Sequence, residues 1–191
     1  HAAGCRSGRP HWLSKRSARR SGARTGRGRM HVLPRDARFS KMNDRIWKPN
    51  VVVAAVMERD GKFLLVEEEV GGRLVYNQPA GHWESGETLV EACVREAMEE
   101  TAHAFRPTAV LGLYSWTHPD TGTTFLRVAF TGETGEHDPA RPLDKDIRRA
   151  LWLSLDEIRA LRERHRSPLV LACIEDYLAG KRHPLSIIGH Y

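Results

Sequence analysis

The feature that most constrains the fold is a polar loop bounded by glycines, followed by a strongly patterned helix. The loop begins at Gly81 and ends at Gly86. Thr88 and Glu91 have the spacing of a capping box, so a helix should begin directly after Thr88. Apolar residues then recur at helical spacing as far as Thr101, at Leu89, Ala92, Cys93 and Ala97. This helix should therefore bury one face.

The other face of this predicted helix holds three glutamates that repel one another. Glu96, Glu99 and Glu100 lie three and four residues apart, and like charges at that spacing each cost about 0.2–0.5 kcal/mol. No lysine lies at the matching positions, although Arg95 can reach back to Glu91 and forward to Glu99. Oxygen-only ligands favour a hard cation, Mg²⁺ or Mn²⁺, over zinc. For the three glutamates taken alone, a solvated acidic face is the alternative interpretation.

The whole segment resembles the Nudix box, the signature motif of the Nudix hydrolases. Gly81 is followed by five residues, Glu87, seven residues and the pattern Arg-Glu-x-x-Glu-Glu, which ends at Glu100. Similarity covers most of residues 46–190 and is closest to the phosphatase NudJ branch of the family, notably at residues 77–82 and 166–170. The resemblance implies an α/β fold: a Nudix α/β/α sandwich with a mixed, mostly antiparallel sheet and a loop-helix-loop catalytic motif.

The resemblance also implies a metal site for Mg²⁺ or Mn²⁺ in the box. Glu96 and Glu100 would be its main ligands, and Glu99 would contribute directly or through water. A backbone carbonyl of Ala80 or Gly81 would complete the site.

Two further roles follow from the resemblance. Glu87 would pair with Arg95 and brace the loop rather than bind the metal. Glu99 is the first candidate for the general base that deprotonates the attacking water, and Glu100 is the next.

The implied activity is Mg²⁺-dependent hydrolysis of a phosphoanhydride bond, with release of phosphate. Nucleoside di- and triphosphates and pyrimidine pyrophosphates such as hydroxymethylpyrimidine pyrophosphate are the implied substrates. Two alternatives stay open: a nucleotide pyrophosphohydrolase that yields a monophosphate and pyrophosphate, and a non-catalytic Nudix module that senses a ligand. The expected partner is a small-molecule nucleotide or pyrophosphate, and we expect a monomer or homodimer.

Several residues near the box are weaker candidates for substrate contacts. Tyr76 and Trp83 can stack on a base, whereas His82 and Arg127 can donate to phosphate oxygens. Aromatic side chains are more often part of the core, and charged ones more often belong to the solvated surface. The stacking interpretation extends to Trp116 and Phe125.

Two positions depart from the usual box. Ala102 replaces the glycine that normally ends the helix in a left-handed conformation, and His103 replaces an aliphatic residue. The left-handed conformation costs an L-residue roughly 1–2 kcal/mol. We therefore expect the helix to run on or to end differently.

The remaining pattern predicts a mixed order of strands and helices. Ser154 and Glu157 form a second capping box, which begins a short helix to about Arg162, and Ser167-Pro168 begins a last helix that ends near Gly180. The predicted strands cover residues 51–57, 62–68, 75–80, 109–116, 123–131 and 150–153.

The charge is divided unevenly along the chain. Residues 1–41 hold 12 of the 30 Lys and Arg and one acid, Asp36, which leaves 18 basic against 23 acidic residues in the rest. We expect residues 1–41 to be a disordered basic extension translated from sequence upstream of the native start, 46–180 the Nudix domain and 181–191 a C-terminal tail packed on that domain. An organelle transit peptide and a nucleic-acid-binding arm are the alternatives for the extension.

Cysteine spacing and hydropathy point to a cytoplasmic protein. The three cysteines lie far apart and form neither a disulfide framework nor a zinc motif. The longest apolar run, residues 51–57, is far shorter than the ~20 residues that a membrane span requires.

Overall fold

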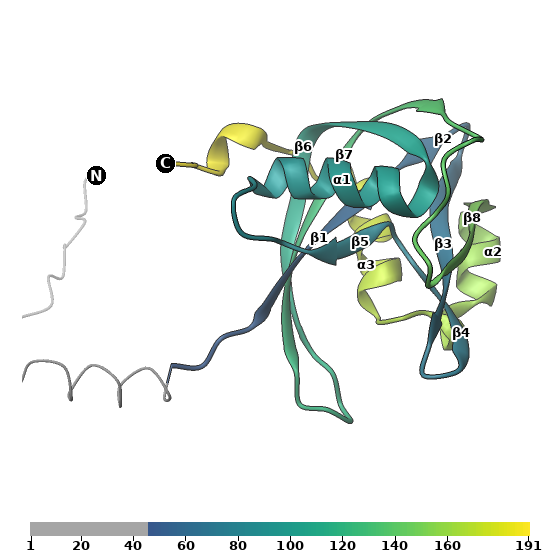
Figure 1. The fold of residues 1–191 in the computed structure, drawn as a ribbon, viewed down its shortest axis with the longest axis horizontal. Coiled ribbons are helices and arrows are strands. Elements are labelled where there is room, and N and C mark those ends of the chain that lie inside the picture. The colour runs from purple at the N-terminus through teal and green to yellow at the C-terminus, as the bar shows by residue number, and fades with distance from the viewer. Residues whose placement is uncertain (1–45) are drawn as a thin grey trace, which may run out of the picture. The chain divides into compact units, whose positions relative to one another are not determined.

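Two β-sheets form the framework of residues 46–191, the part of the chain that the computed structural model describes (Figure 1). The expectations for residues 1–41 lie outside this range. The larger sheet has five strands in the order β5-β1-β7-β6-β9. These strands are β1 (Asn50–Val56), β5 (Ala80–His82), β6 (His103–Thr117), β7 (Thr124–His137) and β9 (His183–Pro184).

The second sheet is built around one central strand. β3 (Lys62–Val70) pairs with β4 (Arg73–Asn77) and β8 (Ile147–Ser154), and β2 (Glu58–Arg59) joins it through a tight turn. All of these pairings are antiparallel, whereas β1 pairs in parallel with β7 in the larger sheet. This arrangement confirms the prediction of a mixed, mostly antiparallel architecture.

Three α-helices accompany the sheets, and both predicted capping boxes are present. They are α1 (Leu89–Thr101), α2 (Leu155–Ala160) and α3 (Leu169–Leu178), with short 3₁₀ turns at η3 (Arg162–Arg164) and η4 (Leu185–Ile187). Thr88 and Glu91 cap α1 reciprocally, as Ser154 and Glu157 cap α2. None of the helices in the described part of the chain has the length and apolarity that a membrane crossing requires.

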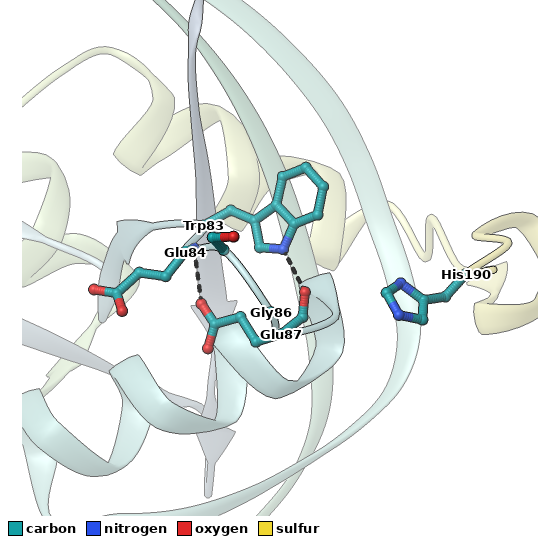
Figure 2. A pocket seen from close by; sticks show the side chains of 6 residues that line it. Trp83, Glu84, Gly86, Glu87 and His190 are labelled. Atoms are coloured by element: carbon teal, nitrogen blue, oxygen red, sulfur yellow. Dashed lines mark hydrogen bonds between the residues drawn. The ribbon is translucent and has the colours of Figure 1, made fainter.

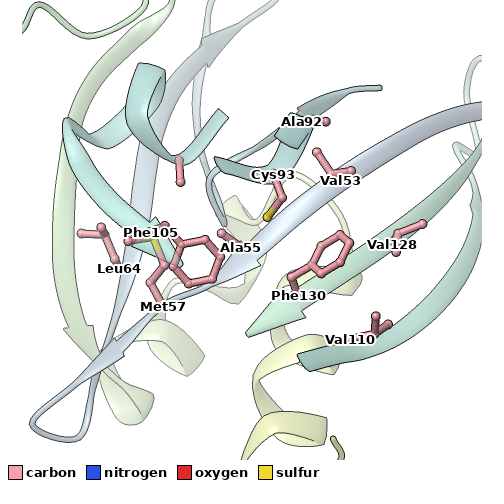
Figure 3. Packing of buried hydrophobic residues seen from close by; sticks show 11 residues of the cluster. Val53, Ala55, Met57, Leu64, Ala92, Cys93, Phe105, Val110, Val128 and Phe130 are labelled. Carbon is pink, nitrogen blue, oxygen red and sulfur yellow. The ribbon is translucent and has the colours of Figure 1, made fainter. Parts of the chain in front are cut away.

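Strand β1 is buried on both faces, and this burial produces the α/β/α sandwich. Successive side chains of a strand point to opposite faces, so Val53 and Ala55 pack in one cluster while Ala54 and Val56 pack in another. The first cluster includes the apolar face of α1, and Figure 3 shows Cys93 of that helix pointing toward Ala55. The second cluster includes α3 and Ile158 of α2. The helices therefore cover opposite faces of the sheet.

Several strand boundaries differ from the sequence predictions. Strands β6 and β7 are much longer than the predicted segments 109–116 and 123–131, and they pair from His103 opposite His137 as far as Thr117 opposite Thr124. The added portions are polar or alternate buried and exposed residues, so they lack a continuous apolar run. The predicted strand 75–80 is instead split into β4 and β5.

The end of α1 corrects the expectation drawn from Ala102. The helix stops at Thr101, and Ala102 takes the left-handed conformation with φ of 55°. Its N–H donates to the carbonyl oxygen of Met98 at 3.0 Å, and its side chain is buried. Alanine thus ends the helix as a glycine would, at an expected strain of roughly 1–2 kcal/mol.

The C-terminal segment lies on the larger sheet. Residues Trp47–Tyr191 form one compact unit, in which Pro184 and His183 of β9 pair with Ala109 and Val110 of β6. Leu185 and Ile188 then pack against the core cluster that contains α1.

We predict that Thr88→Ala lowers the free energy of unfolding by about 1 kcal/mol, because the Glu91 N–H loses its side-chain acceptor. For a protein of this size, the Tm should fall by about 2–4 °C in thermal melting. Thr88→Ser keeps the acceptor and serves as the control, so equal losses in both variants would contradict a capping role.

Candidate active site

Glu87 holds the loop that precedes α1. Its Oε1 accepts a hydrogen bond from the backbone N–H of Glu84 at 2.9 Å, and its carbonyl oxygen accepts from the Trp83 indole at 2.8 Å, as Figure 2 shows. Both carboxylate oxygens also accept from Arg95, at 3.1 and 2.8 Å. These bonds, above all those from Arg95, lower the pKa of Glu87, so the group that braces the loop is a carboxylate.

Arg95 is the cation shared by the carboxylates of this site. Besides Glu87, its Nη1 donates to Glu96 at 2.7 Å and to Glu99 at 3.1 Å. Its Nη2 donates to the carbonyl oxygen of His82 in β5 at 3.0 Å. The reach toward Glu91 expected from sequence is not observed, because that side chain caps the helix. One guanidinium therefore links helix, loop and strand.

Glu96 and Glu100 are buried carboxylates. Their exposed fractions are 8% and 9%, and Glu100 Oε2 accepts from the backbone N–H of Ala80 at 2.8 Å. Burial raises the pKa of Glu96, and it raises that of Glu100 to about 9. A cation added beside these two buried acids would lower their pKa values and favour the carboxylate forms.

The backbone of β5 lies directly against Glu96. A Cβ atom built on Gly81 would lie 2.1 Å from Glu96 Oε1, so any other residue here would displace the Glu96 carboxylate. The close approach places main-chain atoms of Ala80 and Gly81 beside the two buried carboxylates.

The donor set fits a hard divalent cation. It consists of the Glu96, Glu99 and Glu100 carboxylates and the β5 backbone, and oxygen ligands of this kind suit Mg²⁺ or Mn²⁺. In this conformation no three His, Cys, Asp or Glu side chains within residues 46–191 converge on one point. Arg95 holds Glu96 and the Ala80 N–H holds Glu100, so binding an ion requires some of these contacts to be shared or exchanged.

Asp144 is an acid near this cluster that the sequence did not single out. Its backbone N–H donates to the carbonyl oxygen of Glu99 at 3.0 Å, which fastens the loop before β8 to the end of α1. Its charge contributes to the raised pKa values of Glu96 and Glu100. The residue is about forty positions beyond the box in a loop without a motif, so no sequence signal marked it.

A cavity of about 470 Å³ opens beside β5, within the usual size range for small-molecule sites. Trp116 and Phe125, which pair across β6 and β7, form an aromatic wall with ring centroids 6.0 Å apart. Glu68 and Arg127 contribute charged groups to the lining. The cavity therefore combines a flat apolar surface with buried polar groups next to the carboxylate cluster.

Only some of the predicted substrate-contact residues line this cavity. His82 and Arg127 line the cavity, although Arg127 is buried and donates to Gln78 and Asn77 at 2.9 and 3.1 Å. Trp83 lies on the other side of the loop, 44% exposed.

Tyr76 lies in the core instead of the cavity lining. Its hydroxyl donates to Glu67 at 2.7 Å, and its ring belongs to the cluster on the α3 side of the sheet. The structure thus corrects the stacking interpretation for this residue, because its ring faces the sheet's own core. The aromatic wall comes from Trp116 and Phe125, which the sequence marked only as further options.

Sequence reasoning missed the ion pair of Glu68 and Arg166 in this cavity. Arg166 Nη1 donates to Glu68 Oε2 at 2.6 Å. The sequence did contain one signal for it, the run of three acids at residues 67–69 in an otherwise apolar strand. Because successive side chains of a strand point to opposite faces, at least one of these acids had to point inward and needed a partner.

Comparison with known proteins finds relatives that agree with one another in family. The family model described as the NUDIX domain matches residues 47–172. Phosphatase NudJ of Escherichia coli (strain K12) is 44% identical over 146 residues, which cover 76% of this chain and 94% of the relative. A solved NUDIX hydrolase from Nitrosomonas europaea is 55% identical with a TM-score of 0.74, covering 75% of this chain and 98% of that one.

A more distant likeness concerns the fold alone. The bifunctional NMN adenylyltransferase/ADP ribose pyrophosphatase from Francisella tularensis, solved with AMP and a Mn ion, has a TM-score of 0.52 and 19% identity. The match covers 75% of this chain and 44% of that protein.

We predict that Arg95→Gln lowers the free energy of unfolding by about 2 kcal/mol, because it removes several hydrogen bonds to charged partners at once. The Tm should fall by about 4–8 °C. Arg106→Gln is the matched control, since Arg106 is exposed and pairs only with the exposed Glu133 within the described residues. Equal melting of the two variants would show that Arg95 does not stabilise the fold.

Proposed function

The chain belongs to the Nudix hydrolase family, and we propose that it releases phosphate from nucleoside di- or triphosphates or from pyrimidine pyrophosphates such as hydroxymethylpyrimidine pyrophosphate. The name of the 44% identical relative, Phosphatase NudJ, supports this kind of product. The main structural support is the pair of buried carboxylates, Glu96 and Glu100, which lie against β5, whose residues line a cavity of small-molecule size.

The proposal includes a divalent metal, Mg²⁺ or Mn²⁺, held by the box. Glu96 and Glu100 would be the main ligands, with Glu99 and the backbone of Ala80 or Gly81 completing the set. A bound divalent cation supplies charge neutralisation for the polyphosphate and lowers the pKa of a water molecule. Support comes from the raised pKa values of the two buried acids, which a nearby cation would bring down.

Other residues of the box orient the reaction. Glu99 is the first candidate for the general base, because it lies beside the buried pair and its side chain is 32% exposed, within reach of water. Glu100 is the second candidate. Glu87 and Arg95 position the loop and helix and need not touch the substrate.

The setting of the enzyme is also part of the proposal. Cys93 and Cys173, the cysteines that the structure describes, are both free and buried, as expected in the reducing cytoplasm. We propose a monomer or homodimer that acts on a small-molecule substrate. Nucleic-acid binding would involve only the basic segment 1–41, which lies outside the described residues.

Product analysis tests the proposal against its alternatives. The protein is incubated with nucleotides and pyrophosphate esters, and phosphate and pyrophosphate are assayed separately. Phosphate as first product supports the proposal, whereas pyrophosphate with a nucleoside monophosphate would establish a pyrophosphohydrolase. Tight binding without either product would indicate a ligand-sensing module, for which three intact carboxylates have no evident use.

We predict that Glu96→Gln and Glu100→Gln each lower kcat by at least ~10²-fold, since each removes a charged ligand of the proposed metal. Steady-state phosphate release measures the effect. The control is Glu136→Gln, an exposed acid on β7, which should stay near wild type. Wild-type turnover in both box variants would overturn the assignment of these ligands.

We predict that Mg²⁺ stabilises the protein through the same residues. With an assumed Kd of about 1 mM and ~10 mM free ion, mass action gives roughly 1.4 kcal/mol, or about 3–6 °C in Tm. Glu100→Gln should flatten this response in a Mg²⁺ titration at constant ionic strength. Equal shifts in the two proteins would place the ion elsewhere.

A further inference from the structure

One buried acid of the cavity is only half satisfied. The side chain of Glu68 is 13% exposed, and its Oε2 accepts from Arg166 at 2.6 Å. Its Oε1 is also buried but has no hydrogen-bond partner within residues 46–191. A buried carboxylate oxygen without a donor is costly, so a group that supplies the donor would be bound favourably at this point.

The terminal nitrogens of the neighbouring arginines are largely engaged. Both terminal nitrogens of Arg127 donate to protein oxygens, one to Gln78 and the other to Asn77, whereas its Nε is buried without a hydrogen-bond partner within residues 46–191. Arg166 directs one terminal nitrogen to Glu68 itself. At Glu68 Oε1, the cavity therefore offers a free acceptor, which suits an N–H donor.

The cavity walls determine how a ligand can lie. Trp116 and Phe125 form a flat surface on which a heteroaromatic ring can stack, with both side chains half-buried. Ala80 and Gly81, next to the metal carboxylates, line the same cavity. A substrate whose phosphates bind a cation held by Glu96 and Glu100 would then have the aromatic wall available to its ring in the adjoining cavity.

We propose that Glu68 selects substrates whose base carries an amino group, through a hydrogen bond from that group to the unpartnered Oε1. The ligand class is an amino-substituted pyrimidine or purine, with its ring against Trp116 and Phe125. This inference rests on the proposed function only in treating the ligand as a substrate. The usual strength of a hydrogen bond to a charged group implies that a ligand with the amino group binds about 10- to 100-fold more tightly than one without it.

Binding of nucleoside monophosphates tests this selection without turnover, because these ligands lack the anhydride bond. Calorimetry in Mg²⁺ compares the 5′-monophosphates of guanosine with inosine and of adenosine with purine riboside, which differ only in the amino group, and of cytidine with uridine, in which an oxo group and an N3–H replace it. The wild-type protein should bind the amino member of at least one pair about 10- to 100-fold more tightly. Equal affinities within every pair would overturn the inference, and this comparison needs no variant.

Variants assign the preference to Glu68. Glu68→Gln should reduce it below about threefold, because a neutral amide makes weaker hydrogen bonds and can present its own N–H₂. Glu69→Gln is the matched control: this adjacent acid is exposed, pairs with Arg148 and should keep the wild-type preference. Trp116→Leu should weaken both members of a pair alike.

The outcomes separate this inference from the proposed function. A uniform loss of affinity in Glu68→Gln, with the preference kept, would mean that Glu68 acts on the phosphate or metal end, and the inference would be wrong. Hydrolysis of diphosphates with no preference within any pair would leave the function intact but exclude amino selection. A preference for amino ligands without hydrolysis of any diphosphate would instead remove the proposed function while leaving the selective site.

Discussion

Repulsion among carboxylates on one helix face is the constraint around which the site is organised. Glu96, Glu99 and Glu100 are brought together by helical spacing, and two of them are also buried. Arg95 offsets this repulsion within the chain, and it ties the same helix to the loop and to β5. The repulsion that one guanidinium leaves uncompensated is the physical basis of the cation site proposed for this cluster.

The two-sided burial of β1 explains why that cluster sits beside a cavity. β1 holds β5 on one edge and β7 on the other, so the backbone at Gly81 and the aromatic wall at Phe125 belong to the same sheet. α1 packs on one face of this sheet and presents its acids to β5. The relative positions of the proposed metal ligands and of the aromatic wall thus follow from strand order.

Local signals in the sequence predicted the structure of the box well. Contacts between residues far apart in the chain could not be predicted in this way. The bounds of α1 follow from the capping box, and the pairing of Glu87 with Arg95 was expected from the family resemblance. Glu68 and Arg166 meet across 98 positions, and Asp144 reaches α1 through a loop, so neither follows from spacing. Tyr76 was misjudged because its neighbours in space, not in sequence, decide which face of β4 is buried.

The short strand β9 limits self-association of this protein by covering part of an exposed sheet edge. β6 is the last long strand of its sheet, and β9 covers it only at Ala109 and Val110. Beyond that point no other strand within residues 46–191 pairs with its outer backbone groups, and Leu113 is 61% exposed. A chain shortened before His183 would uncover the rest of this edge and offer a template for strand addition, so self-association would increase.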